Sequence, residues 1–497
     1  MKNKIYKLTV VVMIAIFSSC ENAVDITQVG RVTADVAFTN VSELRDGLIS
    51  SYGFFDLTRE VAMAVNYTDE TAEGTENGGQ GRTTGHIFNL NAGSAAASTF
   101  WTNGYDRLNS LNRLIEAADL VEPADAAETA QKNDILGQAY ALRAYANFQL
   151  LSYYSTDYTN DAALAVLKVD FVPSIADKLL RSTNGELFQL IDEDLTKAAS
   201  LIDDQSNPIF VSKDFVTALR ARMAAYRQDY TTAETLANSL MTRYPLANRT
   251  QYRLMFVDED NTEIIFKLQR DVNGIYDNQP GSGTVAATGW IGGVTLFGAN
   301  TPYFEIGRSL FNLIDPDDVR YNVIVDPVSI VAPDYTNTSN YREEDVLQVN
   351  KYPGKPGQVL LNDNKVFRSS EMYLIIVEAK IARNDLTGAA QDIKALRDIR
   401  FGDAQPLPIY ASQQEAYAAL LNERRVEFAF EGHRWKDIKR LGVRANQGAE
   451  RDPIDVAEFG MTPRLAPDDF RFTLPIPLVE FNGNPELRAQ QNPGYNN

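Results

Sequence analysis

Two segments of this chain each predict a pair of packed helices, which strongly restricts the possible folds. The first segment, 213–245, is interrupted near Asp229. Small residues and then a proline recur in it every twelve positions, at Ala221, Ala233 and Pro245. This spacing is typical of a tetratricopeptide repeat, in which small residues let the two helices approach closely and the proline ends the second. A generic helical hairpin is the alternative interpretation of the same spacing.

The second pair is predicted at 369–400, with a break at Asn384 and Asp385. It lacks a terminal proline and is therefore a degenerate copy of the first. Its small residues are Ala379, Ala389 and Ala390. Further apolar stripes at helical spacing comprise Trp101, Tyr105, Leu108, Leu111 and Ile115; Ile135, Ala139, Leu142, Ala146 and Leu150; and Leu187, Leu190, Ile191, Leu195 and Ala198, with Asn184 as the expected N-cap. The prediction is a mainly α fold with a tetratricopeptide-like helical layer and minor β structure.

Long irregular stretches separate these helices. Residues 66–100 and 271–308 are rich in Gly, Asn, Thr and Ser, and 322–366 mixes Pro, Gly and β-branched residues. Loops of this length in a compact protein are usually functional. They interrupt the helices too often for a clean domain boundary, so we expect a single domain over 33–497 with a loop-rich ligand face at about 66–100 and 271–366.

The N-terminus has the pattern of a bacterial lipoprotein signal. Lysines at the start precede an apolar run, 8–17, which is too short to span a bilayer, and Ser18 and Ser19 precede the single cysteine, Cys20. We expect a signal peptide over 1–19, lipid attachment at Cys20 and a tether over 20–32. The alternative is an ordinary signal peptide with an unrelated cysteine.

Composition excludes several classes of function. A formal net charge of −19 argues against nucleic-acid binding, which requires clustered Lys and Arg. One cysteine permits neither an internal disulfide nor a thiolate metal cluster. We expect no cofactor, although a calcium ion between acidic loops stays open. The candidates for it are the acidic groups at 315–318 and 468–469, which we otherwise expect to be solvated helix caps.

The run 423–442 combines charges of alternating sign with apolar residues at helical spacing and is interrupted by Gly432. Near the end of the chain, an extended Pro-x-Pro segment at 473–477 is followed by Asn-Pro-Gly-Tyr at 492–495. These two motifs, with the N-terminal signal and the helix pair at 369–400, resemble the SusD/RagB family, the surface nutrient-binding lipoproteins of glycan-using Bacteroidetes.

The resemblance implies a protein that performs no chemistry. It implies capture of an oligo- or polysaccharide at the outer membrane and delivery to a SusC-like TonB-dependent transporter. The helical repeats would then face the transporter and the loops would face the glycan. Two alternatives stay open: a RagB-like peptide-binding lipoprotein, indicated by a charged groove, and a surface glycan-cleaving enzyme, which needs two carboxylates roughly 5–10 Å apart.

In the run 423–442, we expect Glu423 and Glu427 to pair with arginines three or four residues away on the same helix. Aromatic residues of the run are expected in the core; they are Phe428, Phe430 and Trp435. His433 precedes Asp437 by four residues, but no nucleophile pattern accompanies them, so we expect a structural or helix-end role.

Sugar recognition requires flat aromatic faces and fixed polar groups, which the loops supply. The candidate glycan-binding residues are Tyr67, Asp69, Asn77, Arg82, Tyr276, Trp290 and Phe297. Trp290 lies between Gly289 and Ile291-Gly292, and small neighbours would leave its ring open to a ligand. The alternative for Trp290 is a loop anchor packed on the helices. Trp101 opens an amphipathic pattern and is expected in the core.

Overall fold

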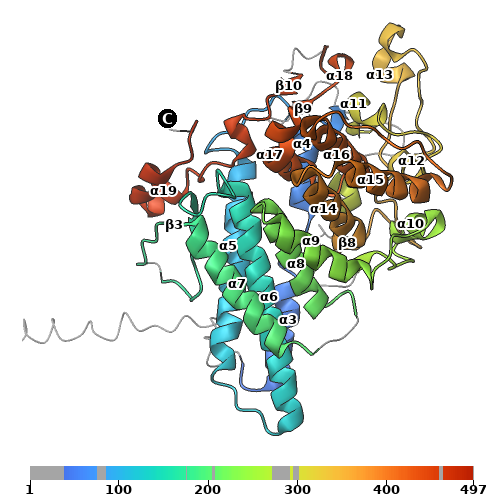
Figure 1. The fold of residues 1–497 in the computed structure, drawn as a ribbon. Helices are drawn as coiled ribbons and strands as arrows, with labels where there is room; N and C mark the ends of the chain where they lie inside the picture. Colours follow the sequence, from blue (N-terminus) through green and yellow to red (C-terminus); the bar gives the residue numbers. More distant parts are fainter. Residues whose placement is uncertain are drawn as a thin grey trace, which may run out of the picture.

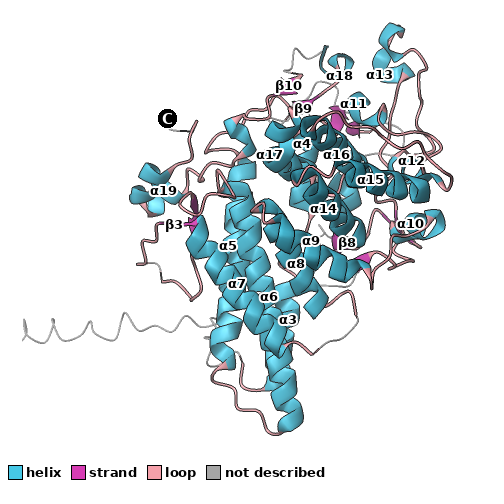
Figure 2. Ribbon diagram, viewed as in Figure 1, coloured by secondary structure: helices cyan, strands magenta, loops and turns pink. Residues whose placement is uncertain are grey.

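The computed structural model describes residues 38–74, 86–174, 176–203, 207–270, 291–294, 302–457 and 463–495. The described chain is mainly helical, as predicted (Figure 2). The helices of its N-terminal part are α3 (Val41–Tyr52), α4 (Thr58–Tyr67), α5 (Ala95–Ala118), α6 (Ala126–Tyr154) and α7 (Asn184–Leu201). Figure 1 shows α3, α5, α6 and α7 packed along one another.

Local sequence accounts for the ends of these helices. Asp125 caps α6 by accepting hydrogen bonds from the N–H groups of Ala127 and Glu128. At α7 the N-cap is Thr183, which forms a capping box with Glu186. The prediction of Asn184 as this N-cap is therefore wrong by one residue: its side chain instead donates hydrogen bonds to the carbonyls of Asp157 and Asn160.

The two predicted helix pairs are confirmed. They consist of α8 (Lys213–Tyr226) with α9 (Tyr230–Met241) and α14 (Ser369–Ala382) with α15 (Leu386–Phe401). Asp229 and Asp385, at the predicted breaks, cap the second helix of each pair. Ala221 and Ala233 are fully buried, and so is Ala389, which allows the close approach expected of small residues. Helix α9 also packs against α14, so the pairs form one layer.

The run 423–442 forms parts of two helices, α16 (Gln413–Glu427) and α17 (Arg434–Ala445). The break lies at Phe430 (φ 61°) and Gly432 (φ 79°). Phe428, Phe430 and Trp435 are buried, as predicted, and so is Trp101. His433 lies at the N-cap position of α17, but its side chain makes no capping hydrogen bond; its ring instead stacks on Phe428 at 4.6 Å.

The expected same-helix pairs of Glu423 and Glu427 are wrong. Helix α16 is buried in the layer, so both carboxylates meet arginines from other elements: Glu423 binds Arg320 and Arg397, and Glu427 binds Arg368 and Arg400. Burial raises the pKa of Glu427, but these arginines outweigh it and hold the pKa well below its usual value. The run is thus a buried ionic centre that joins distant segments.

Within the described segments, the strands form five antiparallel two-stranded sheets. They are β1 (Thr71–Glu73) with β5 (Phe304–Ile306), β2 (Leu164–Leu167) with β3 (Arg181–Thr183), β4 (Ile264–Leu268) with β8 (Asn364–Arg368), β6 (Gly354–Lys355) with β7 (Gln358–Val359), and β9 (Ala449–Glu450) with β10 (Arg464–Leu465). Short helices complete the fold: α10 (Arg249–Met255), α11 (Arg308–Phe311), α12 (Val319–Ile324), α13 (Tyr341–Glu344), α18 (Pro453–Ala457), α19 (Glu480–Gly483), and the 3-10 turns η3 (Ile291–Val294), η4 (Tyr335–Asn337), η5 (Phe470–Phe472) and η6 (Pro485–Gln490).

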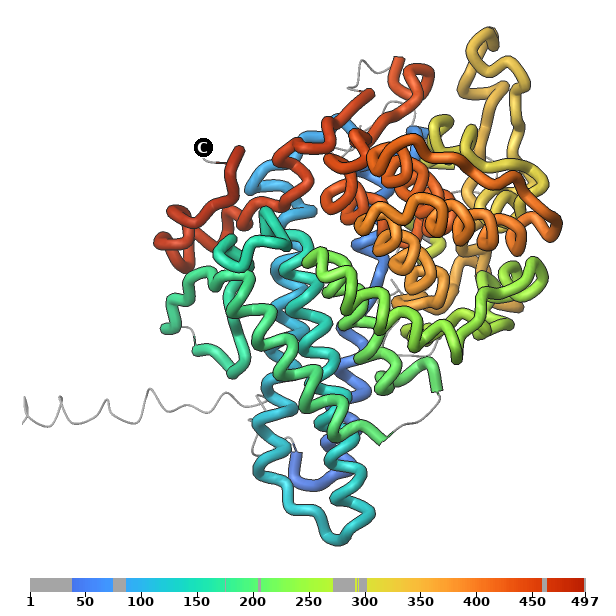
Figure 3. The backbone as a smooth tube through the Cα atoms, viewed as in Figure 1, coloured from blue at the N-terminus to red at the C-terminus, as the bar shows by residue number. Residues whose placement is uncertain are grey.

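One large apolar core extends from Val41 to Tyr495, so both ends of the described chain share it. In the tail, the N–H of Leu474 donates to the carbonyl of Tyr153 at 2.9 Å, and Tyr495 Oη donates to the carbonyl of Thr473. Figure 3 shows the C-terminal segments passing close to α4, which α17 contacts. Within the described ranges, no helix is long and apolar enough to cross a membrane.

Candidate functional site

The structure joins the described ends of the two loops that were predicted to form a ligand face. Strand β1 follows α4 and pairs with β5, with Thr71 opposite Ile306 and Glu73 opposite Phe304. The N–H of Gly74 extends the pairing by donating to the carbonyl of Tyr303 at 2.8 Å. Gly74 belongs to the first predicted loop, 66–100, and Tyr303 to the second, 271–308, so the two loops share a common base.

The far end of the first loop returns to the same base. The ring of His86 stacks on Phe304 at 5.2 Å, and its Nε2 lies 3.2 Å from the hydroxyl of Thr71. Burial and the nearby Arg451 lower the pKa of His86 well below its usual value, so the imidazole is neutral. Both ends of residues 75–85 are therefore held within one small region.

Arginines from the C-terminal part of the chain fix the segment between α4 and β1. Both carboxylate oxygens of Asp69 accept hydrogen bonds from Arg434 at 2.8 Å, and Arg425 lies 3.5 Å away. Burial raises the pKa of Asp69, but the two arginines outweigh it and hold the pKa far below its ordinary value. Arg451 donates to the carbonyls of Asn66 and Thr68. The charged residues of α16 and α17 thus hold the loop base in place.

A cleft of ≈ 260 Å³ opens beside this base. It is lined by Ala72 and Glu73 of β1, Glu305 of β5, Ser339 to Arg342 around α13, and Ile454, Asp455 and Ala457 of α18. Tyr341 Oη donates to Asp455 at 2.7 Å, while Arg342 donates to the carbonyls of Glu73 and Gly74 at 3.0 and 3.3 Å. These bonds hold α13 and α18 against β1.

Burial raises the pKa of Asp455 to about 7. The same cause, together with the nearby Asp455, raises the pKa of Tyr341 above its ordinary value, so its hydroxyl stays protonated. The cleft therefore offers carboxyl, phenol and guanidinium groups in fixed positions, which is the kind of lining that holds hydroxyl-rich or charged ligands.

Comparison with known proteins identifies the family. Residues 332–495 match the family model described as the SusD family, and residues 54–226 match the model described as starch-binding associating with outer membrane. The chain belongs to the SusD family.

Similar SusD-family proteins extend over nearly the whole chain. The SusD-like protein P2 of Formosa agariphila is 24% identical, over 99% of this chain and 100% of that protein. The SusD-like protein P38 of the same organism is 23% identical, over 90% and 92%. A solved SusD superfamily protein of Bacteroides thetaiotaomicron covers 92% of this chain and 100% of its own, with a TM-score of 0.74 and 21% identity. The surface glycan-binding protein A of Bacteroides fluxus covers the same shares, with a TM-score of 0.68 and 19% identity. At these identities the structural likeness establishes the SusD fold.

The structure places two of the predicted glycan-binding residues of this SusD-family chain. Tyr67 ends α4 and is 9% exposed in the core, and Asp69 is 1% exposed beneath the loop base. Their predicted ligand contacts stay predictions, and Asp69 has an evident second role as the partner of Arg434. The other predicted residues lie outside the described residues; they are Cys20, Asn77, Arg82, Tyr276, Trp290 and Phe297.

Sequence reasoning did not single out the cleft residues Tyr341, Arg342 and Asp455. The first two lie in the irregular stretch 322–366, where the sequence alone indicates no particular site residue. Asp455 follows Asp452-Pro453, a helix start that gives no hint of a ligand. Their convergence depends on contacts between segments over 100 residues apart, which no local spacing reveals.

The expected acidic caps are found, with one difference. Asp318 caps α12 and Asp469 caps η5. Asp318 is buried rather than solvated, because Arg320 lies 2.6 Å from its carboxylate. In the described part of the chain, no cluster of three or more His, Cys, Asp or Glu side chains could hold a metal ion.

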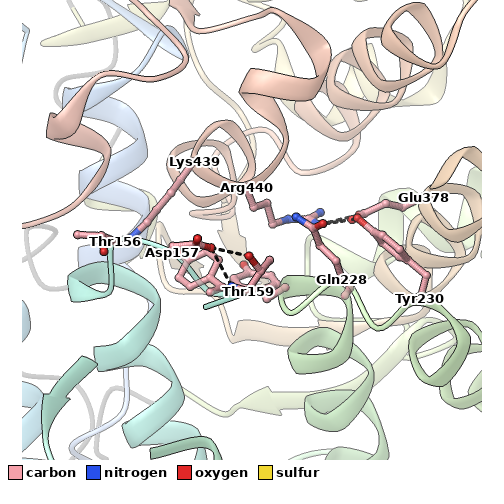
Figure 4. Close-up of a pocket in the computed structure, with 11 residues that line it drawn as sticks. Thr156, Asp157, Thr159, Gln228, Tyr230, Glu378, Lys439 and Arg440 are labelled. Carbon is pink, nitrogen blue, oxygen red and sulfur yellow. Dashed lines mark hydrogen bonds and ion pairs between the residues drawn. The ribbon is translucent and has the colours of Figure 1, made fainter. Parts of the chain in front are cut away.

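A second hollow lies within the helical repeats of this SusD-family chain, between the end of α6, the α8–α9 turn, α14 and α17. Figure 4 shows Arg440 extending to Glu378, with which it pairs at 2.7 Å, beside Tyr230 and Gln228. Lys439 Nζ donates to the carbonyls of Ser152 and Ser155. The volume of this hollow is ≈ 120 Å³. Ligand pockets are usually roughly 300–1,000 Å³, and this hollow is less than half the size of the ≈ 260 Å³ cleft at β1, so it is better explained as a junction between repeats.

Proposed function

We propose that this protein is a non-catalytic lipoprotein of the cell surface that binds an oligo- or polysaccharide and delivers it to a SusC-like TonB-dependent transporter. The observation that carries the proposal is the common base of the two long loops, with a polar cleft beside it, in a chain whose residues 54–226 match a family model described as starch-binding. The surface glycan-binding protein of Bacteroides fluxus, which shares the fold, supports it.

The chemistry of the cleft suits hydroxyl groups. A sugar hydroxyl both donates and accepts, and ionised partners such as Arg342 and Glu305 form stronger hydrogen bonds with it than neutral groups do. Aromatic rings would supply the stacking face, which we assign to Trp290 and Tyr276 on the second loop. The support of β1 by Asp69 and Arg434 keeps the polar groups in place before the ligand arrives.

The remaining parts of the proposal concern location and partner. Signal peptide 1–19, acylated Cys20 and tether 20–32 would anchor a single domain, 33–497, to the outer membrane. The layer of helix pairs would face the transporter, and the loop base would face the glycan. The description of the matching family model, associating with outer membrane, supports this location.

Affinity electrophoresis tests the binding function. Purified full-length protein is run in gels that contain soluble starch, laminarin, xylan or galactomannan, alongside Trp290→Ala and Arg82→Ala. Ile409→Ala is the control, because Ile409 is 91% exposed and lines neither the cleft nor the loop base. Retardation of the wild type in at least one gel, weakened in the two loop variants only, is the expected result. Absence of retardation in every gel, or release of shortened glycan, contradicts the proposal.

A peptide ligand is the second candidate, because the described cleft is lined by charged groups, among them Glu73, Glu305, Arg342 and Asp455. A groove of this kind fits basic peptides as well as sugars. Native mass spectrometry with a tryptic peptide mixture separates the two ligands. Retention of peptides by protein that no polysaccharide gel retards favours the peptide function.

A further inference from the structure

A second polar cleft lies away from the loop base, where the end of α3 and the start of α4 meet α5. Its volume is ≈ 300 Å³. The side chains that matter here are Phe54, Asp56, Arg59, Asn103, Asp106 and Arg107. The cleft is separate from the described cleft at β1, with which it shares no lining residue.

The turn between α3 and α4 presents one aromatic ring to solvent. Phe54 is 47% exposed, whereas the adjacent Phe55 is 1% exposed in the core. The turn is fixed: the N–H of Phe54 donates to the carbonyl of Ser51, and its own carbonyl accepts from Arg107 Nε at 2.7 Å. A single exposed apolar side chain is ordinary on a protein surface. Phe54 differs from such an isolated residue because polar side chains surround it in the cleft.

Arg107 lines this cleft and is held in a fixed position by its contacts. It is buried, its Nη1 donates to Gln149 at 2.8 Å, and its guanidinium lies 5.0 Å from the centre of the Phe55 ring. Arg59 and Asn103 lie beside it; when the Asn103 amide is turned so that its oxygen faces the guanidinium, that oxygen accepts from Nη1 and Nη2 of Arg59 at 2.9 and 2.8 Å. No ion pair of Arg59 is found among the described residues.

Asp106 stands one turn after Asn103 on α5 and is exposed at the edge of the cleft. Asp56 accepts from the N–H of Thr58 at the start of α4. Two arginines and two aspartates therefore line the cleft, and their formal charges cancel. Such a lining disfavours a strongly anionic or cationic ligand, and its mixed donors and acceptors match neutral hydroxyl groups.

We propose that this cleft is a second saccharide-binding site, in which a neutral sugar ring stacks on Phe54 while Arg59, Asn103 and Asp106 hydrogen-bond its hydroxyls. The inference rests on the proposed glycan-capture function and adds a binding position to it. Helix α4 carries Arg59 at its start and leads into β1, and the nine residues from Arg59 to Tyr67 rise about 12 Å. One polysaccharide chain held at both positions gains affinity through effective concentration.

The test compares Phe54→Ala and Asp106→Asn with the wild type in the same soluble starch, laminarin, xylan and galactomannan gels. Phe171→Ala is the matched control, because Phe171 is 38% exposed and lines neither cleft. We expect Phe54→Ala to raise the apparent Kd for a retarding polysaccharide about fivefold or more, and Asp106→Asn to raise it in the same gels. Phe171→Ala should match the wild type. Thermal melts confirm that all three variants are folded, which their exposed positions favour.

The double variant Trp290→Ala/Phe54→Ala should bind more weakly than either single variant. A retarded wild type with unaffected Phe54→Ala and Asp106→Asn overturns this inference and leaves the glycan-capture proposal standing. A wild type that no gel retards overturns both. Weakening by Phe54→Ala without weakening by Trp290→Ala upholds the second site and removes the assignment of Trp290.

Discussion

Asp69 and Arg434 form a two-pronged ion pair, Nε to Oδ1 and Nη2 to Oδ2, both at 2.8 Å, across 365 residues of sequence. Both side chains are buried, at 1% and 3% exposed. The pair connects the start of α17 to the segment that leads into β1. Through it, the C-terminal charged run determines where the loop base lies.

Arg434→Leu is expected to destabilise the protein by about 3–5 kcal/mol, because it leaves the Asp69 carboxylate buried with its main partner removed. Urea unfolding followed by circular dichroism measures the change. Arg464→Ala is the control: its pair with Glu450 is 57% and 53% exposed, and exposed pairs contribute about 0–1 kcal/mol. Equal effects of the two substitutions would contradict the structural role assigned to Asp69.

Gly432→Ala tests the break between α16 and α17. At φ 79°, a Cβ on this residue would lie 2.6 Å from Cβ of Glu60 and 2.9 Å from its carbonyl carbon. Gly357→Ala is the matched control, since Gly357 has φ 82° but nothing within 4 Å of the added atom. Both variants bear the left-handed strain of about 1–2 kcal/mol, and only Gly432→Ala also bears the clash with α4. A lower melting temperature for Gly432→Ala than for Gly357→Ala is expected, and the reverse order would refute the packing argument.

The helix pairs could be predicted from sequence because their signals are local: twelve-residue spacing, small residues and the caps Asp229 and Asp385. The ionic contacts could not. Glu427 has arginines two and three residues before it in the sequence, yet it binds Arg368 and Arg400, which other helices and strands bring to it. In a segment that is buried on all sides, the tertiary fold decides which side chains form ion pairs. Residue spacing in the sequence does not reveal these pairs.

The same limit applies to the candidate site. Asp69 is a predicted site residue because it is polar and lies two residues after the aromatic Tyr67, whereas in the structure its carboxylate pairs with Arg434. The cleft of Tyr341, Arg342 and Asp455 forms only when α13 and α18 meet β1. The sequence predicts a ligand face from the two loops, which stays a prediction, whereas the base shared by their described ends and the cleft beside it required the fold.

Cys20→Ser tests the lipid anchor. If Cys20 is acylated, the wild type should fractionate with membranes and release a diacyl-modified N-terminal peptide detectable by mass spectrometry. The variant should lose both properties and keep its polysaccharide retardation, because the described core begins well after this position. Membrane fractionation that persists in the variant would show that another segment or a partner holds the protein.

Asp455→Asn tests the titration of the cleft. The pKa of Asp455 is raised to about 7 by burial, above the ordinary value of about 3.9. Between these values the native protein holds a proton that the unfolded chain has lost, so this group makes the free energy of unfolding fall as pH rises from about 4 to about 7. Its contribution is fully present below about pH 4 and lost above about pH 7. Urea unfolding across this range should show a shallower decline for Asp455→Asn than for the wild type. Parallel curves would mean that Asp455 is ionised in the folded protein throughout, with Tyr341 and the N–H of Arg308 stabilising the carboxylate.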